Sequence, residues 1–394
     1  MTNRARNRAP RSPRLSSALV LDIAQLDASA LREQFPILDR LAYLNAGTDG
    51  PLPDAAVRAA AQELRREAEN GRTHLHFERR KELSRSLRTA YASILGCAAE
   101  DIALTTCTSE GLALVLEGLS LAPGDEILTS DEEHPGLLGA LAAARQLRGV
   151  RVRQAPWTEI AAAVGPRTRL VACSHVSWMT GRHAPAALAA LDVPVLLDGA
   201  QGVGAVPTDV RALRCAAYAG AGQKWLCGPD GTGMLYVSPE LRSELAVGRR
   251  SYANFAPAPA GAAVDLQSLA LHEDARRLDT YLLSAEVLAA ALAAVEVLRA
   301  AGWDAIHTRA RLLAAQLAEE LSARGRELAV ASPREREGAT LVSFASADPV
   351  AERERLAARG VLLRDIPGRP WLRASVGAWN DEGDLARLLE ALES

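Results

Sequence analysis

The chain has 394 residues, 48% hydrophobic and 24% charged, so it is long enough to bury a large core and should form two unequal domains. Its net charge of −3 gives no basic surface for nucleic acid or an anionic membrane, so a small molecule is the expected partner. Five cysteines without a CxxC pair argue against a metal site or a secreted disulfide framework and favour a cytoplasmic location.

Residues 1–26 predict a disordered N-terminal arm. Arg, Pro and Asn dominate up to about Leu15, and Asp22 interrupts the apolar stretch that follows. This segment is too short and too polar for a signal peptide or a membrane span. Charged residues also interrupt the Ala/Leu stretch from Leu283 to Ala301, which therefore predicts a soluble helix.

Seven short β-rich runs alternate with helical segments from Asp101 onward. This alternation predicts βα units around a mostly parallel seven-stranded sheet with helices on both faces, and such sheets place sites at the carboxyl ends of their strands. The runs are 101–106, 125–130, 150–155, 169–177, 193–198, 216–221 and 233–238, and the helical segments between them include 111–119, 135–147 and 184–191.

The pattern changes after Asp279 to two long helices, roughly 285–299 and 303–323. Strand candidates at 340–345, 360–365 and 371–376 follow, and a last helix starts near Asp381. The expected division is a large domain at 27–284, in which 27–52 contribute to the small-domain side, and a smaller α+β domain at 285–394. The Pro/Ala stretch FAPAPAGAA predicts a loop.

Lys224 stands out because Lys81 and Lys224 are the only lysines among 45 basic residues. Where arginine replaces lysine on the surface, a retained lysine indicates amine chemistry, since a guanidinium stays protonated and is no nucleophile. Lys81 lies in the charged run ERRKEL, which is typical of a solvated helix face. Lys224 lies in a Gly-rich, almost uncharged stretch and is the candidate catalytic residue.

Asp198 ends the buried run VLLD, and Gln201 follows it. A carboxylate at a strand end could keep a pyridine nitrogen protonated, or it could simply cap the next turn. Lys224 lies 26 positions beyond Asp198, across one further predicted strand, so both side chains are expected at the same sheet edge.

A phosphate site is predicted at TTCTSEG. Thr108 and Ser109 lie between a strand and a helix, where free amides and the helix dipole favour an anion, although ordinary N-capping explains these hydroxyls equally well. His134 closes another strand and has two interpretations: a structural histidine, or a ring that lies flat on an aromatic cofactor.

The order TTCTSEG, DEEH, SHVSWMTG, LLDGAQ, GQKWLCGPDGTG and WLRASVGAWN resembles the class V aminotransferase family, the cysteine-desulfurase-like branch of fold-type-I pyridoxal-phosphate enzymes. The resemblance extends from Tyr43 to the C-terminal helix. It implies an aspartate-aminotransferase-like α/β fold, pyridoxal 5'-phosphate as cofactor, and a homodimer with its sites near the subunit interface.

The resemblance also implies roles for single residues on the cofactor side. Lys224 would form a Schiff base with the cofactor, Asp198 would hold the pyridinium nitrogen, and Gln201 would hydrogen-bond the ring phenolate oxygen. The remaining cofactor-binding residues would be His134 stacked on the ring, Thr108 and Ser109 on the phosphate, and Gln223 beside the lysine.

On the substrate side, the resemblance implies that Arg373 clamps the substrate carboxylate and that Asn45 and Ala46 line the pocket. The sequence also departs from the family. Ala221 and Gln223 replace a common Ser and His, Trp178 occupies the place of an Asn, and RRLDTYLLS lacks a clear match for the threonine that usually reaches the neighbouring subunit's phosphate.

The absence of one cysteine reduces the number of possible reactions. A persulfide-forming desulfurase needs a nucleophilic cysteine shortly before the carboxylate-binding arginine, and residues 228–394 contain none. Cys107 and Cys227 lie near the expected cofactor but are interpreted as small buried residues. The favoured function is β-elimination by a C–S lyase, with an aminotransferase or amino-acid epimerase as alternatives.

Two questions stay open at the level of sequence. The fold could serve as a non-catalytic binding protein whose lysine is vestigial. The substrate is also unidentified, because the expected pocket loops carry mixed aromatic and basic residues. Arg249 and Arg250 could bind a second acidic group or face the solvent.

Overall fold

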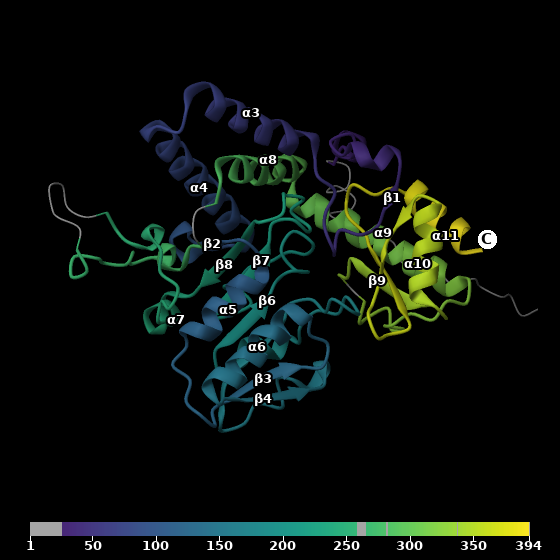
Figure 1. The fold of residues 1–394 in the computed structure, drawn as a ribbon. Helices are drawn as coiled ribbons and strands as arrows, with labels where there is room; N and C mark the ends of the chain where they lie inside the picture. Colours follow the sequence, from purple (N-terminus) through teal and green to yellow (C-terminus); the bar gives the residue numbers. More distant parts are fainter. Residues whose placement is uncertain (1–25, 258–264, 281–282, 337, 394) are drawn as a thin grey trace, which may run out of the picture.

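A seven-stranded mixed sheet forms the centre of the larger domain in the computed structural model, which describes residues 26–257, 265–280, 283–336 and 338–393 (Figure 1). The strand order is β2-β8-β7-β6-β5-β3-β4, and β8 runs antiparallel to both of its neighbours. The strands are β2 (Ile102–Thr105), β3 (Glu126–Ser130), β4 (Arg151–Ala155), β5 (Thr168–Ser174), β6 (Val195–Asp198), β7 (Ala217–Ala221) and β8 (Gly233–Val237). All seven predicted strands are confirmed.

Helices cover both faces of this sheet because its strands are apolar on both sides. In β6, Leu196 packs into one core and Leu197 into the other, as the alternation of side chains along a strand requires. One face is covered by α5 (Thr108–Gly118), α6 (Pro135–Arg148) and α7 (Pro239–Glu244), and the other by α4 (His74–Leu95) and α8 (Ala285–Ala301), with α3 (Asp54–Asn70) packed on α8.

Helix α8, the first helix of the small domain in the sequence-based division, packs against the sheet of the large domain. Leu288, Ala291 and Val295 join the same core cluster as the sheet residues Leu197 and Tyr218. The Ala/Leu pattern of α8 predicts a buried helix but does not indicate which domain it covers. Helix α9 (Trp303–Ala323) contributes most of its buried leucines to the small-domain core.

The smaller domain is built on a three-stranded antiparallel sheet in the order β11-β12-β9. Near it, β1 pairs in parallel with β10, so a segment from the start of the described chain lies against the C-terminal region. Its elements are β1 (Ala42–Tyr43), β9 (Leu341–Ala345), α10 (Pro349–Ala358), β10 (Val361–Leu362), β11 (Arg364–Asp365), β12 (Trp371–Ser375) and α11 (Glu382–Glu393). The α/β class with a smaller α+β domain is thus confirmed.

One predicted helix is shorter than expected. Residues 184–191 form only the 3-10 helix η4 (Ala186–Ala190), which directly follows Pro185. The other short turns are α2 (Ala28–Arg32), η1 (Pro36–Asp39), η2 (Ala99–Asp101), η3 (Trp157–Glu159), η5 (Tyr252–Asn254) and η6 (Ala275–Leu278). The expected arm, except Leu26, and most of the expected loop FAPAPAGAA lie outside the described residues.

None of the helices in the described part of the chain combines the length and the apolar character needed to cross a membrane.

Candidate active site

A cavity of about 240 Å³ lies where the carboxyl ends of the large-domain strands meet residues of the small domain. It brings together all the predicted cofactor residues and the predicted carboxylate-binding arginine: Thr108, Ser109, His134, Asp198, Gln201, Gln223, Lys224 and Arg373. These side chains come from segments far apart in the sequence, and the parallel strand ends position them at one edge of the sheet.

Asp198 is the last residue of strand β6, and Lys224 lies in the loop that follows the adjacent strand β7. Burial lowers the pKa of the Lys224 amine, and Asp198 opposes this shift. Burial raises the pKa of the Asp198 carboxyl, opposed by a 2.9 Å hydrogen bond from the Ala200 amide and by the charge of Lys224. The arrangement places a buried amine and a buried carboxylic acid in one cavity, as the sequence spacing predicted.

The loop that carries Lys224 is held by the N-terminal turn. The Gly50 amide donates a 2.8 Å hydrogen bond to the carbonyl of Gln223. A Cβ atom at Gly50 would lie 2.0 Å from the Lys224 carbonyl oxygen, so only glycine allows this approach.

The predicted phosphate site lies at the N-terminus of α5. Thr108 is the first residue of this helix, and the cap residue before it, Cys107, makes no side-chain capping bond. The buried Thr108 Oγ1 has no hydrogen-bond partner in the described structure. Its hydroxyl therefore does not serve as an N-cap, and it remains available to an anion at the positive end of the helix.

His134 caps helix α6 through its ring. Its Nδ1 accepts a 3.0 Å hydrogen bond from the Gly136 amide, which leaves the proton of the neutral ring on Nε2. Burial, followed by the charges of Lys224, Arg364 and Arg373, lowers the pKa of His134 to about 4. The ring meets Trp178 edge-on, with centroids 4.9 Å apart, so a neutral imidazole borders the cavity.

Gln201 is fixed on both sides of its amide. Its Nε2 donates to the Gly47 carbonyl at 2.7 Å, and its Oε1 accepts from Trp225 Nε1 at 3.0 Å. One N–H of Nε2 remains for the phenolate contact that the family resemblance implies.

Arg373 lies in the middle of β12 and is 1% exposed. Its Nη1 donates to the Trp178 carbonyl at 2.9 Å, and its Nη2 lies 3.4 Å from Thr48 Oγ1. Burial, with Arg364 adding to the effect, lowers its pKa to about 9. The guanidinium still carries a positive charge at neutral pH.

The structure places Asn45 and Ala46 beside the cavity rather than in its lining, which is formed by the next two residues, Gly47 and Thr48. Asn45 Oδ1 accepts a 2.8 Å hydrogen bond from Thr48 Oγ1, and Ala46 is fully buried. Asn45 therefore holds Thr48, whose hydroxyl lies near Arg373.

Arg364 lines the cavity. It begins one of the loops, 364–371, that the sequence predicted to shape the pocket, but the sequence did not assign it a role. Its position in the cavity could be recognised only from the pairing of β11 with β12, which places Arg364 opposite Arg373. The arginines considered from the sequence are engaged elsewhere: Arg249 pairs with Glu117, and Arg250 Nε donates to the Val247 carbonyl at 2.8 Å.

The lining of the cavity suits pyridoxal phosphate. Four lining residues carry buried polar atoms without a hydrogen-bond partner in the described structure: Thr108 Oγ1, Trp178 Nε1, Gln223 Oε1 and Arg373 Nε. Such atoms are costly to bury unless a ligand satisfies them. Hydroxyl and amide donors at the α5 N-terminus match a phosphate, and the buried Asp198 matches a pyridinium nitrogen.

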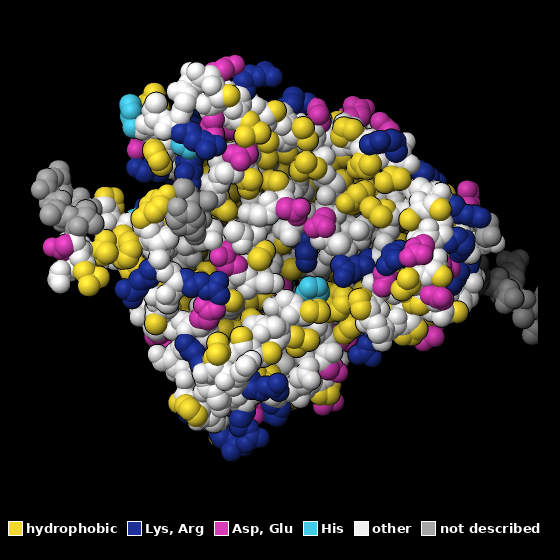
Figure 2. Space-filling view, viewed as in Figure 1, with side chains coloured by type: hydrophobic (Ala, Val, Ile, Leu, Met, Phe, Trp, Pro, Cys, Tyr) yellow, Lys and Arg dark blue, Asp and Glu magenta, His cyan; other side chains and the backbone are white. Residues whose placement is uncertain are grey.

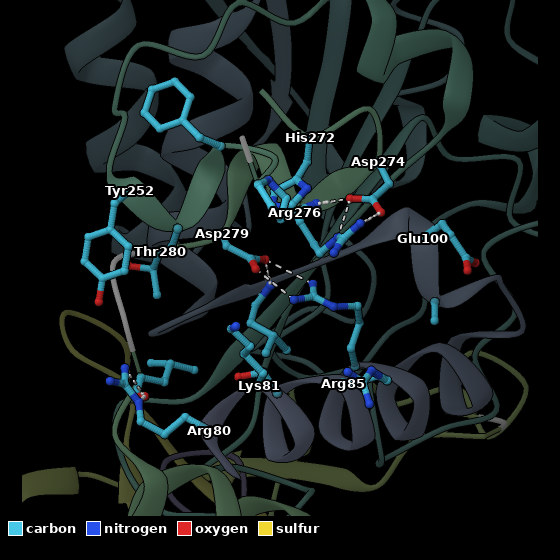
Figure 3. Close-up of a pocket in the computed structure, with 18 of the residues that line it drawn as sticks. Arg80, Lys81, Arg85, Glu100, Tyr252, His272, Asp274, Arg276, Asp279 and Thr280 are labelled. Atoms are coloured by element: carbon cyan, nitrogen blue, oxygen red, sulfur yellow. Dashed lines mark hydrogen bonds and ion pairs between the residues drawn. The ribbon is translucent and has the colours of Figure 1, made fainter. Parts of the chain in front are cut away.

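A larger cavity of about 580 Å³ lies between α4 and the segment from Tyr252 to Leu283 (Figure 3). Two of its arginines form ion pairs, Arg88 with Asp279 and Arg276 with Asp274. At its border, Thr280 Oγ1 donates a 2.8 Å hydrogen bond to Glu110. Thr280 is the threonine of RRLDTYLLS, and its hydroxyl is thus bound to a residue of the same chain. We therefore assign the chemistry to the smaller cavity.

The sequence profile of the family "Aminotransferase class-V" matches residues 42–370. The chain belongs to the class V aminotransferase family. This confirms the family recognised from the sequence motifs, a family of pyridoxal-phosphate enzymes.

Two curated relatives have different activities. Isopenicillin N epimerase of Streptomyces clavuligerus is 31% identical over 241 residues, which cover 55% of this chain and 58% of the relative. Cysteine desulfurase of Klebsiella pneumoniae (strain 342) is 32% identical over 241 residues, covering 55% and 59%. The chain thus spans less than two thirds of the length of these relatives.

Solved structures match over almost the whole chain. A mutant of C-DES with glycine covalently linked to its pyridoxal-phosphate cofactor is 28% identical, with a TM-score of 0.85, covering 92% of this chain and 98% of that chain. The complex of the cystine C–S lyase C-DES with cysteine persulfide has the same identity and TM-score and covers 91% and 99%. The fold-type-I architecture is thereby confirmed.

Proposed function

We propose that this chain is a pyridoxal-phosphate enzyme that acts on the α-carbon of an amino-acid substrate, with Lys224 as its catalytic residue. The observation that carries the proposal is the burial of the Lys224 amine with Asp198 in a cavity lined by unpartnered polar atoms. The glycine adduct of C-DES, whose fold and sequence this chain resembles, supports the choice of cofactor and substrate class.

The residues divide into a group that would hold the cofactor and a group that would hold the substrate. Thr108 and Ser109, at the positive end of α5, would hold the phosphate, and Asp198 would hold the pyridine nitrogen. Arg373, already positioned by the Trp178 carbonyl, would bind the substrate carboxylate. When bound, the cofactor would supply an electron sink for the α-carbon.

Lys224 would move the proton. Because burial lowers its pKa, the amine is more readily neutral than an exposed lysine and is suited to remove the α-proton of a substrate held by Arg373. His134 stays neutral at physiological pH, so it would orient the bound group without adding a charge.

Among the possible reactions, we favour β-elimination of the C–S lyase type. The similarity to the cystine C–S lyase C-DES supports this choice. Residues 228–394 also lack the cysteine that persulfide-forming desulfuration would need. Burial raises the pKa of Cys227 well above its usual range, which makes this thiol a poor substitute nucleophile. Epimerisation is the second candidate, because one curated relative is an isopenicillin N epimerase.

The cofactor assignment is tested with the purified protein and added pyridoxal phosphate. We expect a visible absorbance band that borohydride bleaches and that Lys224→Ala abolishes. Lys81→Ala is the matched control, because it removes the other lysine, which is exposed and paired with Glu78 at 2.8 Å, and should keep the band. A colourless wild type would indicate a binding protein rather than an enzyme of this kind.

The reaction type is tested by incubation with cysteine conjugates and with amino acids plus keto acids. Pyruvate and a released thiol would support the lyase. Turnover with a keto acid would support an aminotransferase, and inversion at the α-carbon of the amino acid without either product would support an epimerase.

A further inference from the structure

Two arginines face each other across the strands that border the cavity. Arg364 of β11 and Arg373 of β12 are directly paired residues of an antiparallel ladder, and both line the cavity. Directly opposite side chains lie on the same face of a sheet, with Cβ atoms about 5 Å apart. Two positive charges at this distance destabilise the strand pair unless an anion lies between or above them.

The neighbouring residues show that this orientation is specific to Arg364. Asp365, the next residue in β11, pairs with Arg353 of α10 at 2.5 Å. Because side chains alternate along a strand, Asp365 lies on the opposite face from Arg364. The strand therefore presents its acidic side chain to α10 and its basic side chain to the cavity.

No carboxylate pairs with either guanidinium within the part of the chain that the structure describes. Arg373 donates to a carbonyl and approaches a hydroxyl, and its Nε is buried without a partner. Asp49 attracts Arg364 without a hydrogen bond to it. Many other arginines, including Arg88, Arg153 and Arg249, form ion pairs with acidic side chains.

One arginine is enough to bind one carboxylate, so the second arginine is available for another anionic group. Arg373 is nearly inaccessible and is held in place, which suits a fixed α-carboxylate. Arg364 is only partly buried and is not held by hydrogen bonds to its side chain in the described structure. The predicted phosphate position is at the α5 N-terminus in the large domain, whereas both arginines come from the small-domain sheet.

We propose that Arg364 binds a second acidic group of the substrate, so that the site selects α-amino acids whose side chain ends in a carboxylate or similar anion. This inference rests on the proposed function, because it assigns the other end of the same substrate to Arg373. The pair then binds the two acidic groups of one substrate.

The test uses the protein with its cofactor and two series of non-reacting probes: the dicarboxylates succinate, glutarate and adipate, and the monocarboxylates butyrate and pentanoate. Isothermal calorimetry gives their dissociation constants. We expect the wild type to prefer a dicarboxylate of one chain length. In Arg364→Gln this dicarboxylate should bind about 10- to 100-fold more weakly, while monocarboxylates change less than about twofold.

Two further variants sharpen the comparison. Arg364→Lys should retain part of the preference, because it keeps the charge but loses the bidentate geometry. Arg369→Gln is the matched control, since this exposed arginine lies in the connection between β11 and β12 and should bind both series like the wild type.

Three outcomes would overturn the inference. Equal weakening of both probe series would place Arg364 on the same carboxylate as Arg373, and unchanged binding would remove it from the site. Loss of cofactor affinity in Arg364→Gln would assign it to the phosphate. A wild type without a Lys224-dependent absorbance band would contradict the proposed function instead. Calorimetry would still show whether the protein binds dicarboxylates more tightly than monocarboxylates.

Discussion

Glu133 is a buried carboxylic acid directly before His134, and it links two strands of the sheet. It accepts hydrogen bonds from the Ser174 amide at 2.9 Å and the Ser174 hydroxyl at 2.6 Å, and another from Ser130. Ser174 in turn pairs with Asp198 in the β5–β6 ladder. Burial raises the pKa of Glu133 to about 7, and the charge of Asp198 adds to this effect.

This raised pKa predicts that the protein loses stability as the pH rises. Between the unfolded pKa of 4.5 and the folded pKa of about 7, the native state binds more protons than the unfolded state. The free energy of unfolding should therefore fall across this window by roughly 3 kcal/mol at most. In Glu133→Gln this contribution should be absent, as measured by denaturant unfolding at pH 5 and pH 8.

Glu126→Gln provides the control for this measurement. The Arg153 guanidinium lowers the pKa of Glu126, so the stability contributed by Glu126 is lost only as the pH falls below its unfolded value of 4.5. Its substitution should leave the difference between pH 5 and pH 8 unchanged. An unaltered difference in Glu133→Gln would show that another group causes the pH dependence.

Lys224 and Arg364 illustrate what single residues reveal in the sequence. Lys224 could be recognised because its chemistry is rare in an arginine-rich chain, and the spacing from Asp198 follows from one intervening strand. Arg364 is one of many arginines, and its place in the cavity depends on its register with Arg373. Likewise, the Gly47 and Trp225 contacts of Gln201 arise from tertiary packing that the sequence pattern does not show.

At the scale of elements, an ion pair joins α4 to the edge of the sheet. Arg88 Nη2 and Nη1 bind the Asp279 oxygens at 2.8 and 3.0 Å, and Asp279 also accepts from the Leu104 amide at 2.9 Å. Figure 3 shows Asp279 at the wall of the larger cavity, which Arg88 also lines. Burial raises the pKa of Asp279, and the charge of Arg88 opposes this shift.

We expect Asp279→Ala to lower the free energy of unfolding by about 3–5 kcal/mol, because it leaves the buried Arg88 charge and the Leu104 amide unpaired. Glu296→Ala is the control, since Glu296 pairs with Arg299 on the exposed side of α8 and should cost less than about 1 kcal/mol. Denaturant unfolding measures both. A loss below 1 kcal/mol for Asp279→Ala would mean that Arg88 finds another partner.

The elements differ in how well the sequence predicts them. Strands such as β5 and β6 are clear because their apolar runs are buried on both faces. Helix α5 begins at Thr108 rather than near Gly111, because the sheet edge sets where the chain turns. There a Cβ at Gly111 would lie 3.0 Å from Ala219 Cβ, so glycine permits the close packing of α5 on β7. Such long-range contacts are absent from local patterns.

At the scale of the whole molecule, apolar side chains are exposed on one side. The described residues of the connection between α7 and α8 lie beside α4 at one side of the body, where Figure 2 shows several hydrophobic side chains. Leu75 and Phe77 of α4 are 66% and 49% exposed, and Tyr252 and Leu266 of the connection are 57% and 83% exposed. Phe77 and Tyr252 line the same cavity, and exposed apolar side chains that lie together are typical of an interaction surface.

We therefore predict that the chain forms a homodimer through this surface. Light scattering after size-exclusion chromatography should give twice the chain mass of 41.8 kDa for the wild type and a monomer for the double variant Phe77→Asp, Leu266→Asp. The substitutions place charges where apolar area would be buried between subunits. Leu147→Asp is the matched control, because Leu147 is 79% exposed on α6 and should leave the dimer intact. A monomeric wild type would contradict the dimer, whereas a dimer in the double variant would place the interface on another surface.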